Sequence, residues 1–366
     1  MNWNNAVPRL SVAWDPTGKG RSVVRGGYNR FVLSEGTRLA EAVNPNSLGG
    51  NTYRWNDLNA DGVPQANEFL TSANFLGSFG GIVTRIDPNL ERPYSDQVNI
   101  GYEQQVFRDL RAGVSYYHRT TKRQISRRNM AALPADYTSI TTLSGAPITN
   151  PLTGVPLTLY NLNPEKVGKV DLLITNVGAL DDNDYNAVEF TAVKRFTNRW
   201  QVLAGFTLQR YEGTLGQGTG DDFNNPNRDI NRNGSRLDQD STHIFKIDTT
   251  YQWPYRISTS LNFQHYTGYP LLPTNLFRGL NQNTETVKLA PNGTLRLDGV
   301  DVANLRIARP TLLMEGRLTL EPLVDLFNLT NNNPVLARAT SFGPVFLRQS
   351  DVLNPFVARF GLKINF

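Results

Sequence analysis

The chain ends on Pro355-Phe-Val-Ala-Arg-Phe-Gly-Leu-Lys-Ile-Asn-Phe366, a stretch in which apolar and polar side chains alternate. The apolar side consists of Phe356, Ala358, Phe360, Leu362, Ile364 and Phe366. The opposite side carries Arg359, Gly361, Lys363 and Asn365. A period of two residues is that of a β-strand and excludes an amphipathic helix. The segment is therefore predicted to be a strand with one face toward a core or lipid and the other toward water.

The same alternation recurs in ten further segments, which are joined in pairs by short polar turns. They cover residues 9–14, 21–32, 94–105, 110–125, 184–195, 199–211, 243–253, 257–264, 301–312 and 317–326. The polar faces carry charges in mid-strand, among them Lys246, Asp248, Glu321 and Asp325. No dry core tolerates such charges, so the second face must meet water. The pattern predicts an all-β protein of about eleven strands.

Strand length favours a membrane protein. Strands of about ten residues match the length that crosses a bilayer at a tilt, whereas soluble strands average nearer five or six. A wide antiparallel barrel with a water-filled lumen satisfies both faces at once. In a soluble two-sheet protein the polar face would instead point outward to solvent, and any single strand fits that alternative equally well.

Composition agrees with a transmembrane β-barrel. No apolar run approaches the roughly 18 residues of a membrane-spanning helix, and mean hydropathy is −0.39. Cysteine is absent, which excludes disulfides, thiolate metal sites and a cysteine nucleophile. Aromatic residues near strand ends predict two interfacial girdles, with the general preference of aromatic residues for strands as the alternative. One would contain Trp14, Phe196, Trp200, Trp253 and Phe366, and the other Tyr28, Tyr116, Tyr211 and Tyr266.

The connections divide into two sets that orient the chain. Short turns are expected at residues 15–20, 106–109, 196–198, 253–255 and 314–316, and long loops at 33–92, 126–183, 212–241, 267–300 and 330–354. Outer-membrane barrels have short periplasmic turns and long extracellular loops, so the carboxy terminus is predicted to be periplasmic. An odd number of strands cannot close antiparallel, and no signal peptide follows Met1. Either maturation or truncation would remove a signal peptide, and the odd strand count favours truncation, with amino-terminal strands missing.

Several segments resemble one family. Pro8-Arg-Leu-Ser-Val-Ala-Trp-Asp-Pro-Thr-Gly-Lys-Gly20, Tyr94-Ser-Asp-Gln-Val-Asn-Ile-Gly-Tyr-Glu103, Ser241-Thr-His-Ile-Phe-Lys-Ile-Asp-Thr-Thr-Tyr251, Tyr266-Thr-Gly-Tyr-Pro270 and Val324-Asp-Leu-Phe-Asn-Leu-Thr-Asn331 are similar to barrel strands of TonB-dependent receptors. The likeness extends over nearly the whole chain and is strongest to receptors that carry a carboxypeptidase-regulatory-like domain before the plug. It implies that residues 1–366 are the carboxy-terminal half of a barrel of about 22 strands, without the plug and the amino-terminal strands.

The resemblance also implies a location, a function and partners. Such receptors lie in the outer membrane of Gram-negative bacteria and take up a ligand with energy supplied through TonB, which contacts the plug region. This chain would supply barrel wall, lumen lining and extracellular loops for an unknown small ligand, among outer-membrane lipid and lipopolysaccharide, after insertion by the barrel assembly machinery. The alternatives are a passive porin-like or structural barrel and, third, a soluble calcium-binding β protein.

The sharpest local motif is Asp57-Leu-Asn-Ala-Asp-Gly-Val-Pro-Gln-Ala-Asn-Glu68, which matches the twelve-position calcium loop. Its oxygen ligands would be Asp57, Asn59, Asp61, the Val63 carbonyl, Gln65 and a bidentate Glu68. Gly62 stands where the loop turns sharply, and Pro64 replaces the usual aliphatic residue. No flanking helices are evident, so the motif predicts an isolated extracellular loop that binds Ca²⁺ or is simply a polar turn. A weaker match begins at Asp229 and ends at Asp240.

Other polar clusters are less specific. Basic residues gather at Arg119, Lys122, Arg123, Arg127 and Arg128, where lipopolysaccharide phosphates would be natural partners and a solvated face is the alternative. The net charge of +5 comes with no nucleic-acid-binding module, so nucleic acid is not an expected partner. His243 lies near Asp238 and Asp240, but no nucleophile elbow or phosphate loop accompanies them. The protein is not expected to be an enzyme.

Overall fold

A computed structural model describes residues 3–34, 36–44, 50–79, 84–178, 183–213, 224–232, 235–237, 239–314 and 317–366. Strands are the main regular structure of the chain, which contains two short α-helices, α1 (Arg38–Ala42) and α2 (Ala66–Phe69), in these ranges. None of the helices described there is long and apolar enough to cross a membrane.

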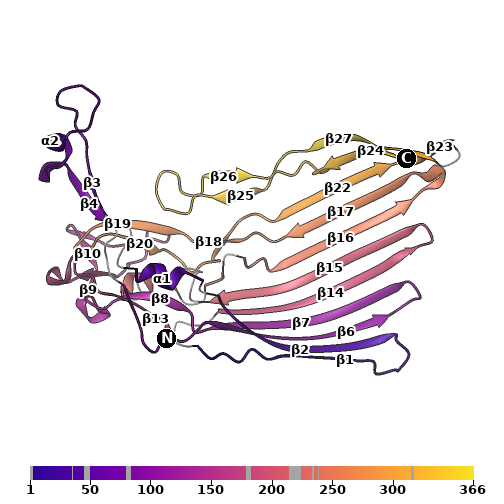
Figure 1. Cartoon of the computed structure of the whole chain (residues 1–366), viewed down its shortest axis with the longest axis horizontal. Coiled ribbons are helices and arrows are strands. Elements are labelled where there is room, and N and C mark those ends of the chain that lie inside the picture. The colour runs from indigo at the N-terminus through magenta and orange to yellow at the C-terminus, as the bar shows by residue number, and fades with distance from the viewer. Residues whose placement is uncertain are drawn as a thin grey trace.

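One large antiparallel sheet, here called the wall sheet, dominates the molecule (Figure 1). Its strands lie side by side in chain order: β1 (Arg9–Trp14), β2 (Ser22–Val32), β6 (Tyr94–Gln105), β7 (Leu110–Lys122), β14 (Asn183–Thr197), β15 (Trp200–Gly213), β16 (His243–Gln252), β17 (Ser258–Tyr266), β22 (Val300–Ala308), β24 (Leu318–Phe327) and β27 (Val357–Asn365). A short strand, β23 (Thr311–Leu313), also pairs with β24. Each connection returns the chain to the strand beside it.

All eleven predicted segments lie in this sheet, with two local differences. Residues 301–312 are divided between β22 and β23, although the register continues from the pair Ala308 and Leu323 to the pair Thr311 and Leu320. Pro310 lies in the gap and has no N–H to donate to the ladder, which explains the break. The segment predicted over 110–125 ends at Lys122, because Arg123 has a φ of 58° and turns the chain out of the sheet.

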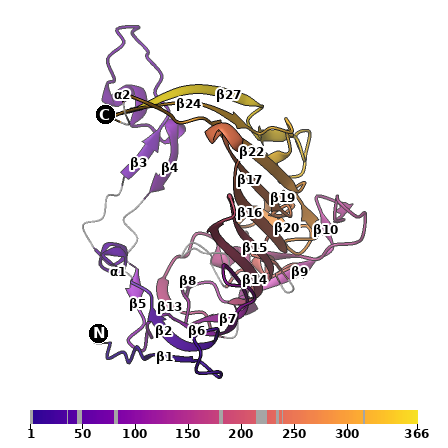
Figure 2. The ribbon, with the colours of Figure 1, turned by 90° about the vertical axis from the view of Figure 1, so that its right-hand side faces the viewer.

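The wall sheet curves into an open arc with β1 at one edge and β27 at the other (Figure 2). Within the described residues, neither β1 nor the outer edge of β27 has a second partner strand. With ten antiparallel steps between them, β1 and β27 run in the same direction, as the odd strand count predicts. The sheet is therefore part of a barrel wall and is not closed.

The two faces of the sheet differ as the alternation predicts. Apolar side chains of the edge strands are strongly exposed on the outer face, with Phe360 at 79% and Leu10 at 65% of full exposure. The same register rows place Arg306, Asp325 and Arg359 together on the other face. A cavity of about 740 Å³ on that face touches six strands from β14 to β24, which identifies it as the concave side. The apolar face is the one that meets lipid.

The expected aromatic girdles are only partly observed. At the end with the short turns Trp14, Trp253, Phe196 and Trp200 are exposed by 40% or more. At the opposite end Tyr28 and Tyr116 share the outer face with Val98 and Val188. Tyr211 lies directly opposite Tyr185 in the sheet and shares the concave face with Arg119. Tyr266 also lies on the concave face, where its ring contacts Lys246. Including these two tyrosines in an outer girdle was wrong, because they fall on the other parity of their strands.

The long connections gather at one end of the wall sheet and the short turns at the other (Figure 1). We call the folded long connections the loop layer. It contains small sheets formed by β3 (Gly50–Tyr53) with β4 (Phe75–Phe79), β5 (Arg85–Ile86) with β13 (Leu172–Asn176) and β8 (Ile125–Asn129), β9 (Tyr137–Ile140) with β12 (Leu159–Leu162), β10 (Thr142–Leu143) with β11 (Ala146–Pro147), β18 (Pro270–Leu271) with β21 (Leu295–Arg296), β19 (Thr274–Leu280) with β20 (Asn283–Lys288), and β25 (Val335–Arg338) with β26 (Gln349–Val352).

The loop layer has its own buried apolar clusters. One contains Leu90, Ile125 and Ile174 and is covered by Trp3 and Ile86. A second brings Ile148 and Leu159 from one loop against Val287 from another; both Leu159 and Val287 have no exposed surface. Burial of such side chains contributes roughly 1.5–3 kcal/mol each. These clusters hold segments that are distant in sequence together at the end of the wall sheet that carries the long connections.

Candidate functional site

The concave face carries a charged cluster on three adjacent strands. Asp325 of β24 accepts hydrogen bonds from Arg306 of β22 at 2.5 Å and from Arg359 of β27 at 2.6 Å. The Asp325 side chain is 5% exposed, whereas the two guanidinium groups are half exposed. One carboxylate thus joins three strands, because the three residues lie directly opposite one another in the sheet. Farther along the same cavity Asp248, Asn262 and Asn304 form a polar row through bonds of 2.7 and 3.1 Å.

A second concave cavity lies nearer the loop layer and measures about 390 Å³. Cross-strand register brings Gln97, Arg119, Tyr185 and Tyr211 into one row across four strands. The Arg119 guanidinium lies 5.4 Å from the centre of the Tyr185 ring and 5.6 Å from that of Tyr211. The Lys246 amine lies 5.3 Å from the Tyr266 ring. The cavity therefore combines positive charge with aromatic faces.

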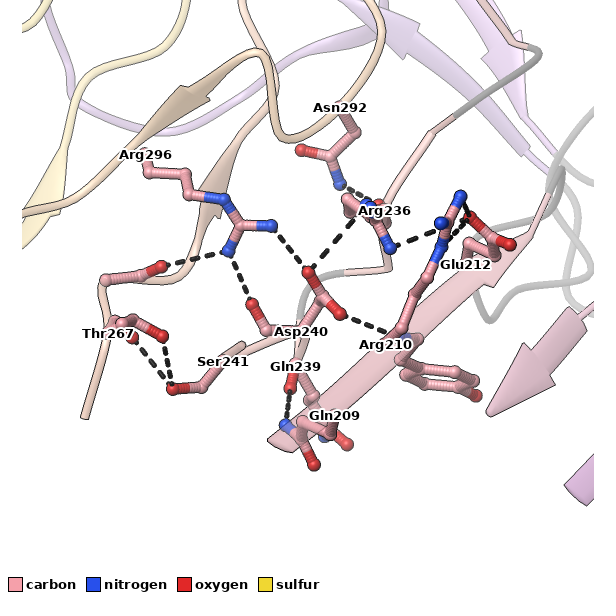
Figure 3. A network of polar contacts seen from close by, with 12 residues as sticks. Gln209, Arg210, Glu212, Arg236, Gln239, Asp240, Ser241, Thr267, Asn292 and Arg296 are labelled. Atoms are coloured by element: carbon pink, nitrogen blue, oxygen red, sulfur yellow. Dashed lines mark hydrogen bonds and ion pairs between the residues drawn. The ribbon is translucent and has the colours of Figure 1, made fainter. Parts of the chain in front are cut away.

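A buried ionic network joins two long loops to the wall where β15, β16 and β17 meet the loop layer (Figure 3). Asp240 has no exposed surface and accepts from the Tyr211 N–H at 2.6 Å and from the Arg296 guanidinium at 2.5 Å. Arg296 also donates to the main-chain carbonyls of Asp240 and Gly268. Ser241 completes the junction by donating to the Thr267 carbonyl at 2.8 Å.

Gly268 belongs to the Tyr266-Thr-Gly-Tyr-Pro270 motif, and the structure explains why this position requires glycine. A Cβ at this position would lie 1.7 Å from the Leu297 carbonyl oxygen, so only glycine permits this close approach. The carbonyl of Tyr269 then accepts a hydrogen bond from the Leu297 N–H at 2.9 Å. The motif thus joins the end of β17 to the strand that carries Arg296.

A second polar cluster is buried among three loops. Asn227 has no exposed surface and exchanges hydrogen bonds with the main chain of Tyr160, at 2.9 and 2.7 Å. Asn225 donates to Glu285 at 2.5 Å. Buried amides that satisfy main-chain groups in this way replace the ladder bonds that a loop lacks. Periodicity gave no signal for Asn227 or Asp240. Asp240 was noticed only as the end of the weaker calcium-loop match and as a neighbour of His243, and Asn227 is marked only by the density of Asn and Asp between residues 221 and 240.

The predicted calcium ligands lie together on a hairpin that projects from the loop layer, between β3 and β4 (Figure 1). Gly62 has a φ of 73° and donates its N–H to Asp57 at 2.9 Å. Asp61 accepts from the Val63 N–H at 2.7 Å and from the Gln65 side chain at 2.7 Å. Asn59 accepts from the Asp61 N–H at 3.1 Å. The positive φ of Gly62 and the hydrogen bonds to Asp57, Asn59 and Asp61 give the sharp turn that the twelve-position motif predicts.

Glu68, the predicted bidentate ligand, is engaged elsewhere. It is 1% exposed and lies in α2, so a short helix follows the loop where none was expected. Its Oε1 accepts from the Leu58 N–H at 3.0 Å, and its Oε2 accepts from Trp55 and from the Gln65 N–H. Among the described residues no three His, Cys, Asp or Glu side chains gather in a way that could hold a metal ion. A cation here would depend on the Asn59, Gln65 and Val63 oxygens as well.

The structure separates the other clusters that the sequence suggested. Arg119 lies on the concave face, Lys122 pairs with Tyr94 on the opposite parity, and Arg127 and Arg128 belong to β8 in the loop layer. His243 stacks on Phe206 with an interplanar angle of 8°, while Asp240 belongs to the Arg296 network. Asp238 lies outside the described residues. Asp229 pairs with Arg232 at 3.0 Å, and burial raises the pKa of its carboxyl.

Together, the antiparallel wall, its lipid-facing apolar side and its polar concave side define the class of outer-membrane β-barrels. Comparison with known proteins gives the family. Residues 1–269 match the family model described as "Outer membrane beta barrel domain", and the chain belongs to that family. It is thus an outer-membrane protein. No curated protein sequence matches it.

Solved structures show the same fold. The outer membrane transporter YddB from Escherichia coli matches over 97% of this chain with a TM-score of 0.53 and 11% identity. The siderophore receptor PirA from Acinetobacter baumannii matches over 98% with a TM-score of 0.52 and 12% identity. The chain spans 39% and 40% of the length of these two proteins. The resemblance to transporter and receptor barrels is confirmed at the level of fold.

Proposed function

We propose that the chain forms part of the barrel of a TonB-dependent receptor, in which it supplies wall, lumen lining and ligand-binding loops for the energised uptake of a small ligand. The observation that carries the proposal is the division of the molecule. A continuous wall of eleven strands has a polar concave face, and a folded loop layer covers only one of its ends. Eleven strands would be half of a barrel of about 22, with plug and remaining strands supplied by other sequence.

Crosslinking in intact cells tests this function. The complete gene product should form a crosslink with TonB, and the yield should rise when its ligand is present, because energised receptors present the plug region to TonB. Dissipating the proton gradient should stop accumulation of the ligand but leave its binding at the cell surface unchanged. Accumulation that continues without the gradient would contradict the proposal.

A passive porin-like barrel is the second candidate, and the broad polar concave face is the observation that favours it. Conductance in planar bilayers separates the two. An open pore gives steady steps of conductance, whereas a receptor barrel closed by a plug gives almost none. Because the chain belongs to an outer-membrane family, the soluble calcium-binding alternative is set aside.

Calcium binding by the loop from Asp57 to Glu68 is a separate proposal. Its support is the position of Gly62, whose N–H bonds to Asp57, and the convergence of Asp57, Asn59 and Asp61 within one short turn. Ca²⁺ would have to share Glu68 with the N–H donors that now hold it. Calorimetry should show heat on addition of Ca²⁺ that disappears in Asp57→Asn. The matched Asp15→Asn in a turn at the other end should behave like the unchanged protein, and absence of heat would reject the site.

Two partners belong to the membrane setting. Lipopolysaccharide phosphates would compete at the loop end for Arg30 and Arg123, which lie 4.2 and 5.3 Å from the Tyr94 ring and pair with Asp96 and Glu91. Arg30→Gln should weaken binding of lipopolysaccharide micelles, and Arg111→Gln on the concave face should not. The barrel assembly machinery would act on the terminal strand, where Phe366 is fully exposed. Phe366→Asp should therefore lower the amount inserted in the outer membrane.

A further inference from the structure

The cavity near Arg119 carries positive charge that the described part of the protein does not neutralise by ion pairs. Arg119 contacts the rings of Tyr185 and Tyr211, and Lys246 contacts the Tyr266 ring. Neither cation forms an ion pair with a carboxylate among the described residues. By contrast, Arg306 and Arg359 on the same face share Asp325. The cavity also contains Glu189, so its lining has two cations and one anion.

The shape of the cavity suits a small molecule. Its volume of about 390 Å³ falls within the range of roughly 300–1,000 Å³ that is typical of ligand pockets. Ala187 and Gly205 leave space on the wall between longer side chains, and Tyr117 and Tyr185 contribute aromatic surface. Contact with two rings restricts the Arg119 guanidinium before any ligand arrives, which reduces the entropy lost on binding.

We propose that this cavity binds a small organic anion with a flat apolar body, whose negative group contacts Arg119 and whose body lies against Tyr117. The inference deepens the proposed receptor function and rests on it. Charge and aromatic surface have separate tasks here. Arg119 would select a negative group, and Tyr117 with its cross-strand neighbour Ala187 would accommodate a planar ring.

Binding of 2-naphthoate to the full chain in detergent micelles tests the proposal. The neutral 2-naphthamide has the same ring system without the charge, and inorganic phosphate has charge without a ring. We expect 2-naphthoate to bind more tightly than either. Arg119→Gln should weaken its binding roughly ten- to a hundredfold, since it removes a hydrogen bond to a charged group. Lys246→Gln should have a smaller effect, because Lys246 lies three strands from Arg119 and six residues further along the sheet.

Arg111→Gln is the matched control. Arg111 lies on β7 eight residues from Arg119, hence on the same face, and lines a cavity at the other end of the strand. Binding should not change in this variant. Arg119→Lys retains the charge and should recover part of the affinity, and raising the salt concentration should weaken binding to the unchanged protein. Circular dichroism of each variant reports whether the sheet is intact.

Three results would overturn the inference: no binding of 2-naphthoate at millimolar concentration, equal binding of 2-naphthamide, or equal losses in Arg111→Gln and Arg119→Gln. These readings are independent of TonB. Crosslinking of the complete gene product to TonB together with failed anion binding would reject this ligand class and leave the receptor function standing. Anion binding without a TonB crosslink would retain the site and reject energised uptake.

Discussion

In the wall sheet, main-chain hydrogen bonds join every strand to its neighbour. Most side chains face lipid on the outer side or water on the concave side. In the loop layer, the strands are short and buried side chains hold the segments together, such as Asp240, Asn227 and Leu159. A ladder tolerates the loss of one side chain, because its hydrogen bonds belong to the backbone. A layer assembled from single buried contacts should respond to single substitutions far more strongly.

Asp240→Ala should have the largest effect. It leaves Arg296 without its buried carboxylate and the Tyr211 N–H without its acceptor, and breaking a buried ion pair costs roughly 3–5 kcal/mol. Hydrogen exchange should show opening of the loops around residues 235–241 and 267–296, with β6 and β7 unchanged. Asp298→Ala is the control: that carboxyl is 63% exposed in its pair with Arg338 and should cost less than about 1 kcal/mol. Equal effects would contradict the comparison.

Leu159→Ala should have the next largest effect. Leu159 is fully buried against Ile148 and Val287, and such truncations cost roughly 2–5 kcal/mol. Leu362→Ala makes the same chemical change on the wall, where Leu362 is 59% exposed to lipid. Because acyl chains replace the lost contacts, its cost should be small. Limited proteolysis of the loops should accelerate in the first variant only.

Asp325→Asn tests the side-chain contact that joins three strands of the wall. Loss of charge weakens the bonds from Arg306 and Arg359 and should lower stability by roughly 1–3 kcal/mol. Asp248→Asn on the same face keeps an acceptor for Asn262, its neutral partner, and should be nearly silent. Thermal unfolding followed by circular dichroism measures both. A midpoint that falls equally in the two variants would mean that the arginines contribute nothing specific.

Acid should produce the smallest and most local change. The hydroxyl of Thr175 and the N–H of Asn89 hold the pKa of Asp87 below its ordinary value of 3.8. A lowered pKa stabilises the fold above the unfolded value, and this contribution is lost as the pH falls below about 3.9 toward the folded pKa. Hydrogen exchange of β13 should therefore increase below that pH. Asp87→Asn should reduce this pH dependence, and an unchanged dependence would exclude Asp87 as its source.

Sequence reasoning recovered the wall because its signal is repeated. In β27, Arg359 and Phe360 lie on opposite faces because successive side chains of a strand alternate between the two faces. The same alternation holds along each long strand. The row that contains Arg119 came from the cross-strand register and was not predicted, because Arg119 had been grouped with basic residues nearby in sequence. The strand ends were also misjudged at Arg123 and Pro310. Tyr211 and Tyr266 were assigned to the wrong face because their role was inferred from strand ends alone and the parity of their positions was not used.

The loop layer could not be predicted in the same way. Asp240 meets Arg296 across 56 residues, and Asn150 donates to the Leu289 carbonyl across 139. No local pattern encodes contacts of this span. The calcium-loop motif is an exception, because all of its predicted ligands lie within twelve residues and the turn follows from Gly62 and its neighbours. Local motifs were therefore visible, whereas the contacts that join separate loops required the structure.

Spin labels on the terminal strand test the central claim most directly. The chain has no cysteine, so Arg359→Cys, Phe360→Cys, Gly361→Cys, Leu362→Cys, Lys363→Cys and Ile364→Cys each give one labelling site. In lipid bilayers, labels at 360, 362 and 364 should collide mainly with oxygen dissolved in the membrane, and labels at 359, 361 and 363 mainly with a water-soluble nickel complex. Collision rates that do not alternate, or that alternate with the opposite phase, would contradict a wall that faces lipid on one side and water on the other.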